Sequence, residues 1–236
     1  MPGRFLRVNI ERSIMCGRYT LQHSSVAISH RFALGQIHFD WTPRYNIAPS
    51  QLIPVIWNQD GLRHIASHRW GLVPFWAKDP SAGSQSINAR AETLQDRASF
   101  RQPFQRRRCL IPADAFYEWT GPARSRQPVC IRRLDAELFA FAGLWDEWRP
   151  PDGPPLRTAA IVTVPPNSLL SSIHNRMPAI LRPEHEAAWL APDAAAGDLI
   201  SCLQPYPSEW MEWFPVSRRV NSPAHDDPEC MAREAS

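Results

Sequence analysis

The stretch QLIPVIWNQDGLRHIASHRW, residues 51–70, decides what kind of fold this chain adopts. Two apolar runs, Gln51–Trp57 and Leu62–Trp70, flank a short polar segment that ends in Asp60-Gly61. Asp-Gly between two apolar runs is the typical signal of a tight β-hairpin, because both residues tolerate a positive φ. The stretch therefore predicts two paired strands and a fold that is rich in β-structure.

Outward from this hairpin, similar short apolar runs are bounded by turn residues. Strands are expected at Cys109–Pro112, Ala113–Trp119, Pro128–Arg133, Leu138–Trp145, Leu156–Val164 and Trp213–Val216. Helices are expected at Ser24–Leu34, within the segment from Ile87 through Arg108, at Glu184–Leu190 and at Ala194–Leu203. No repeat or break in composition divides the chain, which predicts a single domain.

Three further segments are expected to lack regular structure. Arg44–Gln51 is interpreted as an ordered loop, because its ends are polar and Pro49 interrupts it. The arginine run Arg106–Arg108 is expected to be a solvated face. The tail Pro223–Ser236 is expected to be disordered, apart from contacts made by Asn221 and Ser222 just before it.

Composition excludes several classes of protein. With 236 residues, 44% of them hydrophobic, the chain is long enough to bury a large core. No run approaches the roughly 18 to 20 apolar residues that span a bilayer, so a soluble, cytoplasmic protein is expected. Five scattered cysteines with no C-x-x-C pair argue against a zinc knuckle and a disulfide framework. His64 and His68 lie in an expected strand, and no metal site is predicted there.

The segment MCGRYT, residues 15–20, offers a reactive amino terminus. If the chain begins at Met15, removal of that residue leaves Cys16 with an α-amine and a thiol on adjacent carbons. Their ordinary pKa values are near ~8 and ~8.5, so both are partly nucleophilic at neutral pH. Such an aminothiol condenses with an aldehyde to an imine and then to a thiazolidine. The alternative is that Cys16 is a small buried hydrophobic residue.

Residues 1–14 lack the uninterrupted apolar region of a secretory signal. Either translation begins at Met15, or the protein removes its own leader. The choice matters because an internal Cys16 has no free amine.

Other segments suggest further chemistry. Glu118 stands among aromatic residues in ADAFYEW, residues 113–119, where desolvation raises a carboxyl pKa and favours a general acid. The alternative is a half-buried strand residue paired with arginine. His174 precedes Pro178 in a bend and is either a catalyst or a structural residue. The aromatic loop Trp70–Lys78 is either a platform for unpaired bases or a hydrophobic cluster.

Taken together, these motifs resemble those of the SRAP family, the SOS-response-associated peptidases. They are MCGRYT (15–20), RYNIAPSQ (44–51), WGLVPFWAKD (70–79), INARAET (87–93), RRCLIPADAFYEW (107–119), FAGLWDEW (141–148), IHNRMPAIL (173–181) and VNSPAHD (220–226). The resemblance implies a mixed α+β, strand-rich single domain with a barrel-like β core and peripheral helices. The domain would span residues 15–228, between a leader or mis-assigned start at residues 1–14 and a tail at residues 229–236. Such a leader is foreign to the family's plan, in which the cysteine follows the initiator methionine.

The resemblance also implies an activity. Members of the family sense abasic sites in single-stranded DNA and form a thiazolidine crosslink to them, without a metal or an organic cofactor. A monomer with single-stranded DNA as its partner is expected. Cys16 would be the nucleophile, Asn88 would hold its amine or the sugar, Glu118 would donate a proton that opens the deoxyribose, and His174 would shuttle protons. The implied DNA contacts are Arg18, Arg90 and Arg176 for phosphates, and Phe75 and Trp76 for stacking on bases.

Two other functions stay open on the sequence. One is a cysteine peptidase that uses Cys16, His174 and Glu118, which would explain removal of a leader. The other is a non-catalytic binder of single-stranded DNA that relies on arginine and aromatic side chains alone.

Overall fold

A closed β-barrel forms the centre of the molecule. The computed structural model describes residues 16–35, 39–122 and 124–234, and residues 1–14, expected to be a leader, lie outside this part. Five strands pair in the order β10-β4-β3-β6-β9, and the ring closes because β9 also pairs with β10. Their bounds are β3 Leu52–Gln59, β4 Leu62–Trp70, β6 Arg108–Ala113, β9 Phe139–Trp148 and β10 Leu156–Val164.

The hairpin predicted from residues 51–70 is confirmed. Strands β3 and β4 pair in register from Leu52↔Arg69 to Gln59↔Leu62. At the turn, Asp60 has φ 54° and Gly61 has φ 77°. Two successive positive φ values match the twist of the flanking strands, which is why Asp-Gly suits this turn.

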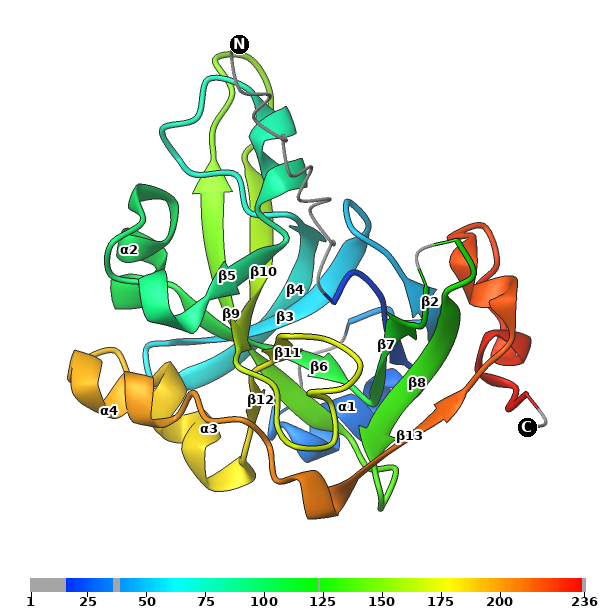
Figure 1. Ribbon diagram of the computed structural model, residues 1–236. Helices are drawn as coiled ribbons and strands as arrows, with labels where there is room; N and C mark the ends of the chain where they lie inside the picture. The colour runs from blue at the N-terminus through cyan, green and yellow to red at the C-terminus, as the bar shows by residue number, and fades with distance from the viewer. Residues whose placement is uncertain (1–15, 36–38, 123, 235–236) are drawn as a thin grey trace, which may run out of the picture.

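A second, five-stranded sheet lies beside the barrel, with strand order β13-β8-β7-β1-β2 (Figure 1). Its strands are β1 Tyr19–Leu21, β2 Arg44–Ile47, β7 Ala115–Thr120, β8 Gln127–Arg133 and β13 Met211–Pro215. The prediction of a loop at Arg44–Gln51 was therefore wrong for residues 44–47. Pairing with β1 supplies the hydrogen bonds that the sequence pattern did not reveal.

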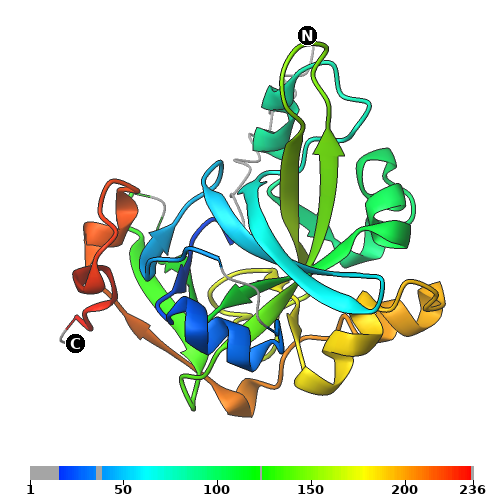
Figure 2. The ribbon, with the colours of Figure 1, turned by 180° about the vertical axis from the view of Figure 1, so that it is seen from behind.

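Short elements surround the two sheets, and Figure 2 shows them from behind. The remaining strands are β5 Asn88–Arg90, β11 Met177–Pro178 and β12 Ile180–Leu181. The α-helices are α1 Ser25–Arg31, α2 Ala98–Arg106, α3 Pro183–Leu190 and α4 Ala196–Ser201. The 3-10 helices are η1 Pro80–Gln85, η2 Ala91–Thr93, η3 Ser208–Trp210, η4 Arg218–Asn221 and η5 Pro228–Met231. In the described part of the chain, no helix is long and apolar enough to cross a membrane.

The expectation of a solvated arginine run was wrong at Arg108. This residue begins β6 and is only 6% exposed. Its guanidinium donates hydrogen bonds to the carbonyl oxygens of Trp189 at 2.7 Å and Phe104 at 2.6 Å. A guanidinium can be buried when backbone oxygens satisfy its N–H groups, and here Arg108 joins the barrel to α3.

The second sheet has a hydrophobic cluster on each face. The larger cluster fills the barrel and covers the inner face of the sheet, where Phe116 and Ile131 lie. The smaller one covers the outer face and includes Tyr117, Phe214 and Val220. Residues 217–231, here termed the C-terminal cap, pack over this outer face.

The C-terminal tail is ordered over most of its length, so the prediction of disorder from Pro223 onward was wrong. Asp226 accepts hydrogen bonds from the backbone N–H groups of Tyr45 at 2.6 Å and Asn46 at 2.8 Å. Val216 forms a β-bridge with Arg233. These partners lie far away in the sequence, which explains why local patterns did not indicate them.

Candidate functional site

Strand pairing brings Cys16 against Glu118. Tyr19 of β1 is opposite Phe116 of β7 in an antiparallel register, so the residues just before β1 run beside the end of β7. The Cys16 nitrogen donates a hydrogen bond to Glu118 Oε1 at 2.9 Å. Cys16 is 1% exposed and Glu118 is 5% exposed. The nucleophile and the acid implied by the sequence are therefore in direct contact.

Glu118 is a buried carboxyl group without an ion pair among the described residues. Burial raises its pKa from 4.5 to about 7, while hydrogen bonds from the backbone of Cys16 and Trp119 and the charge of Arg126 act in the opposite direction. The predicted rise in pKa is thus found, and the alternative of an arginine-paired strand residue is not. A carboxyl group with this pKa is partly protonated at neutral pH, as a general acid requires.

The thiol of Cys16 differs from the sequence-based expectation. Burial raises its pKa well above 9.0, and the neighbouring charge of Glu118 raises it further. The thiol is therefore protonated at pH 7 rather than partly ionised. Cys16 also has φ 36°, in the left-handed region where a residue with a side chain is strained.

His174 and Glu118 line the same cavity. Both residues line a hollow of about 380 Å³, together with Arg126, on the loop after β7, and Ile173. The backbone N–H of Arg176 donates to His174 Nδ1 at 3.1 Å, which leaves the proton of a neutral ring on Nε2. Burial lowers the pKa of His174, and the charges of Arg126 and Arg176 add to this effect. The imidazole is therefore neutral at pH 7.

Asn88 and Arg90 lie on β5, which runs parallel to β10. Alternation along the strand puts them on one face, while Ala89 on the other face is fully buried. Arg90 is exposed and pairs in register with Thr163. Arg176 reaches the same place, because it donates a hydrogen bond to the Thr163 carbonyl oxygen. Two of the predicted phosphate contacts therefore meet at the end of β10.

The charge of Arg176 is already matched by an acid. Its guanidinium forms a bidentate ion pair with Glu92, in which Nη2 lies 2.9 Å from Oε2. Arg90 has no such ion pair among the described residues. Of these two, Arg90 thus offers the freer positive charge.

Arg18 is held in place by the C-terminal cap. It donates to Asn46 Oδ1 at 2.8 Å, to the Val220 carbonyl oxygen and to the Asn221 carbonyl oxygen at 3.2 Å. Its guanidinium carbon lies 5.9 Å from the ring centre of Trp119. These contacts give Arg18 a structural role, and its contact with DNA stays a prediction.

Phe75 and Trp76 form an exposed aromatic pair after β4. Their exposed fractions are 52% and 53%. The Phe75 N–H donates a hydrogen bond to Asp146 Oδ2 at 3.0 Å, and Asp146 belongs to β9. This bond holds the loop that contains Phe75 against β9. The alternative interpretation, a buried hydrophobic cluster, is excluded for these two rings. They are accessible for stacking, which itself stays a prediction.

The described residues do not bring together three His, Cys, Asp or Glu side chains in a way that could hold a metal ion. His64 instead stacks on Trp57, with the ring centres 5.7 Å apart. Sequence reasoning missed Arg126, which lines the cavity beside Glu118. Its only local signal is a basic loop, Arg124-Ser125-Arg126, between two strands.

The fold is a closed β-barrel with an adjoining sheet. At the candidate site, the nitrogen of a buried cysteine is hydrogen-bonded to a buried carboxyl group. The protein is therefore a strand-rich single domain whose candidate site contains a cysteine and a carboxyl group. The model of the family described as SOS response associated peptidase (SRAP) matches residues 15–223. The chain therefore belongs to the SRAP family, as the sequence motifs predicted.

Relatives and solved structures agree with this assignment. The abasic site processing protein YoqW of Bacillus subtilis is 45% identical over 219 residues, which cover 91% of this chain and 98% of YoqW. The abasic site processing protein HMCES of Gallus gallus is 34% identical over 81% of this chain and 66% of its own. A crystal structure of a protein from Bacteroides thetaiotaomicron superimposes with a TM-score of 0.84 at 27% identity, covering 93% of this chain and 100% of the other.

Proposed function

We propose that this protein captures abasic sites in single-stranded DNA through a covalent thiazolidine bond to Cys16. The family and the names of its relatives, abasic site processing proteins, support the processing of abasic sites. The observation that carries the covalent chemistry is the 2.9 Å hydrogen bond between the Cys16 nitrogen and Glu118. This contact supports the proposal, because the carboxyl group lies beside the atom that would attack the sugar.

The first step generates an aldehyde. An abasic deoxyribose is mostly a closed ring in equilibrium with an open aldehyde. Protonated Glu118 donates its proton to the ring oxygen O4′ while the C1′ hydroxyl gives its own proton to water, and the C1′–O4′ bond breaks. The products are a C1′ aldehyde and a 4′ hydroxyl. The raised pKa of Glu118, about 7, keeps the required proton available at neutral pH.

The second step joins protein and sugar. The α-amine of Cys16 attacks C1′, and loss of water from this adduct gives an imine. The Cys16 sulfur then adds to the imine carbon, and the thiol proton passes to the nitrogen as the five-membered ring closes. Neutral His174, which carries its proton on Nε2, would relay these protons. Asn88 would hold the amine or the sugar.

Single-stranded DNA would be bound by exposed cationic and aromatic side chains. The candidates are Arg90 at the end of β10 and the aromatic pair Phe75 and Trp76. Arg18 and Arg176 would add weaker phosphate contacts, because hydrogen bonds and an ion pair within the protein already occupy their guanidinium groups. Because phosphate contacts release counterions, non-covalent binding weakens with salt, whereas the completed crosslink does not.

The reaction needs a free amine on Cys16, so a leader must be removed if translation begins before Met15. We infer a second activity at the same site, self-cleavage of the peptide bond before Cys16. The strained φ of 36° at Cys16 and the Glu118 carboxyl group beside its nitrogen favour this bond as the point of cleavage. The thiol would attack the preceding carbonyl carbon, Glu118 would protonate the departing nitrogen, and water would hydrolyse the resulting thioester.

One experiment separates the candidate functions. The purified protein is incubated with an oligonucleotide that carries one abasic site, and a heat-stable adduct is sought on a denaturing gel. We expect an adduct for the wild type and none for Cys16→Ala, while Cys202→Ala, a matched cysteine control, behaves as the wild type. Peptide cleavage without an adduct would favour a peptidase. Salt-sensitive retention of DNA without either product would favour a simple binder. Intact mass shows whether Cys16 has become the first residue.

A further inference from the structure

A second cavity adjoins the one that contains Glu118 and His174. It has a volume of about 350 Å³ and is lined by Trp119, Arg124, Ser125, Arg126, Arg218 and Asn221. Trp119 and Arg126 also line the first cavity. The two hollows therefore share a wall, formed by the end of β7 and the loop that leads into β8. We term the second one the arginine pocket.

The arginine pocket is lined by positively charged side chains and by no acidic one. Its lining includes Arg124, Arg126 and Arg218 but no Asp or Glu. All three are exposed, and within residues 16–35, 39–122 and 124–234 none of them forms an ion pair. By contrast, Arg219, the neighbour of Arg218, is paired with Asp227, and Arg149 is paired with Glu147. Three guanidinium groups without an ion-pair partner among the described residues, placed around one hollow, favour a ligand with negatively charged oxygens.

Hydrogen bonds fix one wall of the arginine pocket. Trp119 Nε1 donates to Asn221 Oδ1 at 2.7 Å, and Arg18 lies over the same indole ring while donating to the Asn221 carbonyl oxygen. The C-terminal cap is thus tied to the end of β7. This tie places Arg218, in the same turn of η4 as Asn221, beside the Glu118 cavity.

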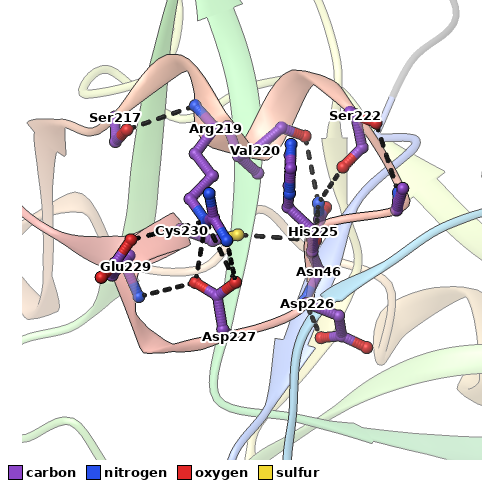
Figure 3. Close-up of polar contacts among 11 residues, drawn as sticks. Asn46, Ser217, Arg219, Val220, Ser222, His225, Asp226, Asp227, Glu229 and Cys230 are labelled. Carbon is purple, nitrogen blue, oxygen red and sulfur yellow. Dashed lines mark hydrogen bonds and ion pairs between the residues drawn. The ribbon is translucent and has the colours of Figure 1, made fainter.

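Asn46 anchors the cap through its side-chain amide (Figure 3). It is fully buried, and its Nδ2 lies within hydrogen-bond distance of three cap carbonyl oxygens, those of Val220 at 3.2 Å, Ser222 at 3.0 Å and His225 at 2.6 Å. A buried amide held in this way keeps the cap in one conformation. The arginine pocket is therefore formed before any ligand binds.

The pocket combines cations with an aromatic wall, which is the combination that proteins use for single-stranded nucleic acid. We propose that the arginine pocket binds the nucleotide next to the abasic residue, with its backbone phosphodiester among Arg124, Arg126 and Arg218 and its base against Trp119. This inference rests on the proposed function, because the pocket adjoins the cavity where the lesion would react. It adds a subsite that the sequence motifs did not indicate.

Non-covalent binding tests the phosphate contacts. The double variant Arg124→Gln/Arg218→Gln is compared with Arg97→Gln/Arg101→Gln, which removes the same charge at the start of α2. This helix lies on the opposite side of the barrel from the C-terminal cap in both views (Figures 1 and 2). The probe is an undamaged fluorescent oligothymidylate, and anisotropy gives Kd across a series of NaCl concentrations. We expect the pocket variant to weaken binding about tenfold or more and to reduce the slope of log K against log salt by about 0.7 for each phosphate that is no longer bound. The control variant should retain most of the slope.

Equal losses in both double variants would mean that only net charge matters, and this would overturn the proposal. Unchanged binding in the pocket variant would overturn it as well. Thermal melting of each variant checks that the fold is intact, and all four substituted side chains are exposed.

The position of the subsite is tested with three abasic oligonucleotides, in which the lesion is internal, at the 5′ end or at the 3′ end. With the internal lesion, the pocket variant should need more DNA to reach the same limiting rate of adduct formation. One of the two end-lesion substrates lacks the nucleotide that the pocket holds, and on it variant and wild type should react alike. A variant defect of the same size on both end-lesion substrates would contradict the proposal. If the wild type forms no adduct at all, the proposed function is wrong. The salt-slope experiment uses undamaged DNA, so it still tests phosphate binding by the pocket in that case.

Discussion

The nitrogen of Cys16 donates a hydrogen bond to Glu118 Oε1 at 2.9 Å, although the two residues are 102 positions apart in the chain. The register of β1 on β7 creates this contact. Burial then gives the carboxyl group a pKa of about 7, so that a partly protonated carboxyl group stands beside the Cys16 nitrogen, the proposed nucleophile. Adduct formation should therefore depend on the protonation states of both groups.

Glu118→Gln should slow adduct formation by about 100-fold or more, which is the usual contribution of a general acid. The amide retains an oxygen that can accept from the Cys16 nitrogen, so binding of undamaged single-stranded DNA should change little. Single-turnover gels give the rate and anisotropy gives the affinity. Glu184→Gln, a surface substitution on α3, serves as the control. Equal rates for Glu118→Gln and the wild type would refute the role of the acid.

The rate of adduct formation should have a maximum near pH 7 to 8. Imine formation needs the unprotonated amine of mature Cys16, so the rate rises as pH approaches about 8. Ring opening needs protonated Glu118, and this form is lost as pH rises through its pKa of about 7. In Glu118→Gln the alkaline decrease should disappear while the acid limb remains. A profile from pH 5.5 to 9.5 for both proteins measures this, and an alkaline limb that persists in the variant would assign it to another group.

Glu118 should also make stability depend on pH. Between its unfolded pKa of 4.5 and its folded pKa of about 7, the unfolded chain has released the proton that the folded chain retains. Raising the pH therefore favours unfolding, by an amount on the order of 3 kcal/mol at pH 8. Glu118→Gln removes this effect, so its free energy of unfolding relative to the wild type should increase from pH 4.5 to pH 8. Urea titrations at both values measure it, and a constant difference would show that the carboxyl group is not desolvated.

Arg90→Ala should weaken non-covalent binding of single-stranded DNA and reduce its salt slope by about 0.7, because Arg90 is exposed at the end of β10 and has no acid partner among the described residues. Arg101→Ala, on α2, is the matched control. Anisotropy at several salt concentrations provides the slope. An unchanged slope for Arg90→Ala would count against a phosphate contact.

Asn46→Ala should destabilise the protein by roughly 2 to 4 kcal/mol, because it removes the amide donor from buried cap carbonyl oxygens and one of the acceptors of Arg18. It should also weaken DNA binding through the arginine pocket, since the cap positions Arg218. Asn58→Ala, a substitution on the partly exposed end of β3, offers a comparison. Urea unfolding and anisotropy report the two effects. If Asn46→Ala is destabilised but binds DNA normally, the cap is not needed to position Arg218 in the arginine pocket.

Local patterns in the sequence predicted much of the fold. The Asp60-Gly61 turn, the alternating strands from Cys109 onward and the aromatic surroundings of Glu118 all involve neighbours within a few residues. Periodicity and turn chemistry report such relationships directly. The motif order identified the family, which the family model over residues 15–223 confirms.

The strand β2, the burial of Arg108 and the ordered cap escaped prediction because their partners come from distant parts of the chain. β2 forms because it pairs with β1, and Arg108 is buried because the Trp189 carbonyl oxygen accepts its hydrogen bond. The cap is ordered in part because Asp226 accepts a hydrogen bond from the Tyr45 N–H. A segment with polar ends looks the same in sequence whether or not such a partner exists. Long-range hydrogen bonds supplied what local propensity lacked.

By itself the sequence determined which groups are candidates for the proposed reaction, namely Cys16, Glu118 among aromatic residues and His174 in a bend. Only the tertiary structure decided their states. The pairing of β1 with β7 places Cys16 on Glu118, and removal of both from water raises the pKa of the thiol and of the carboxyl group. A pKa depends on the dielectric and the charges around a group, and these are set by residues that only folding brings together.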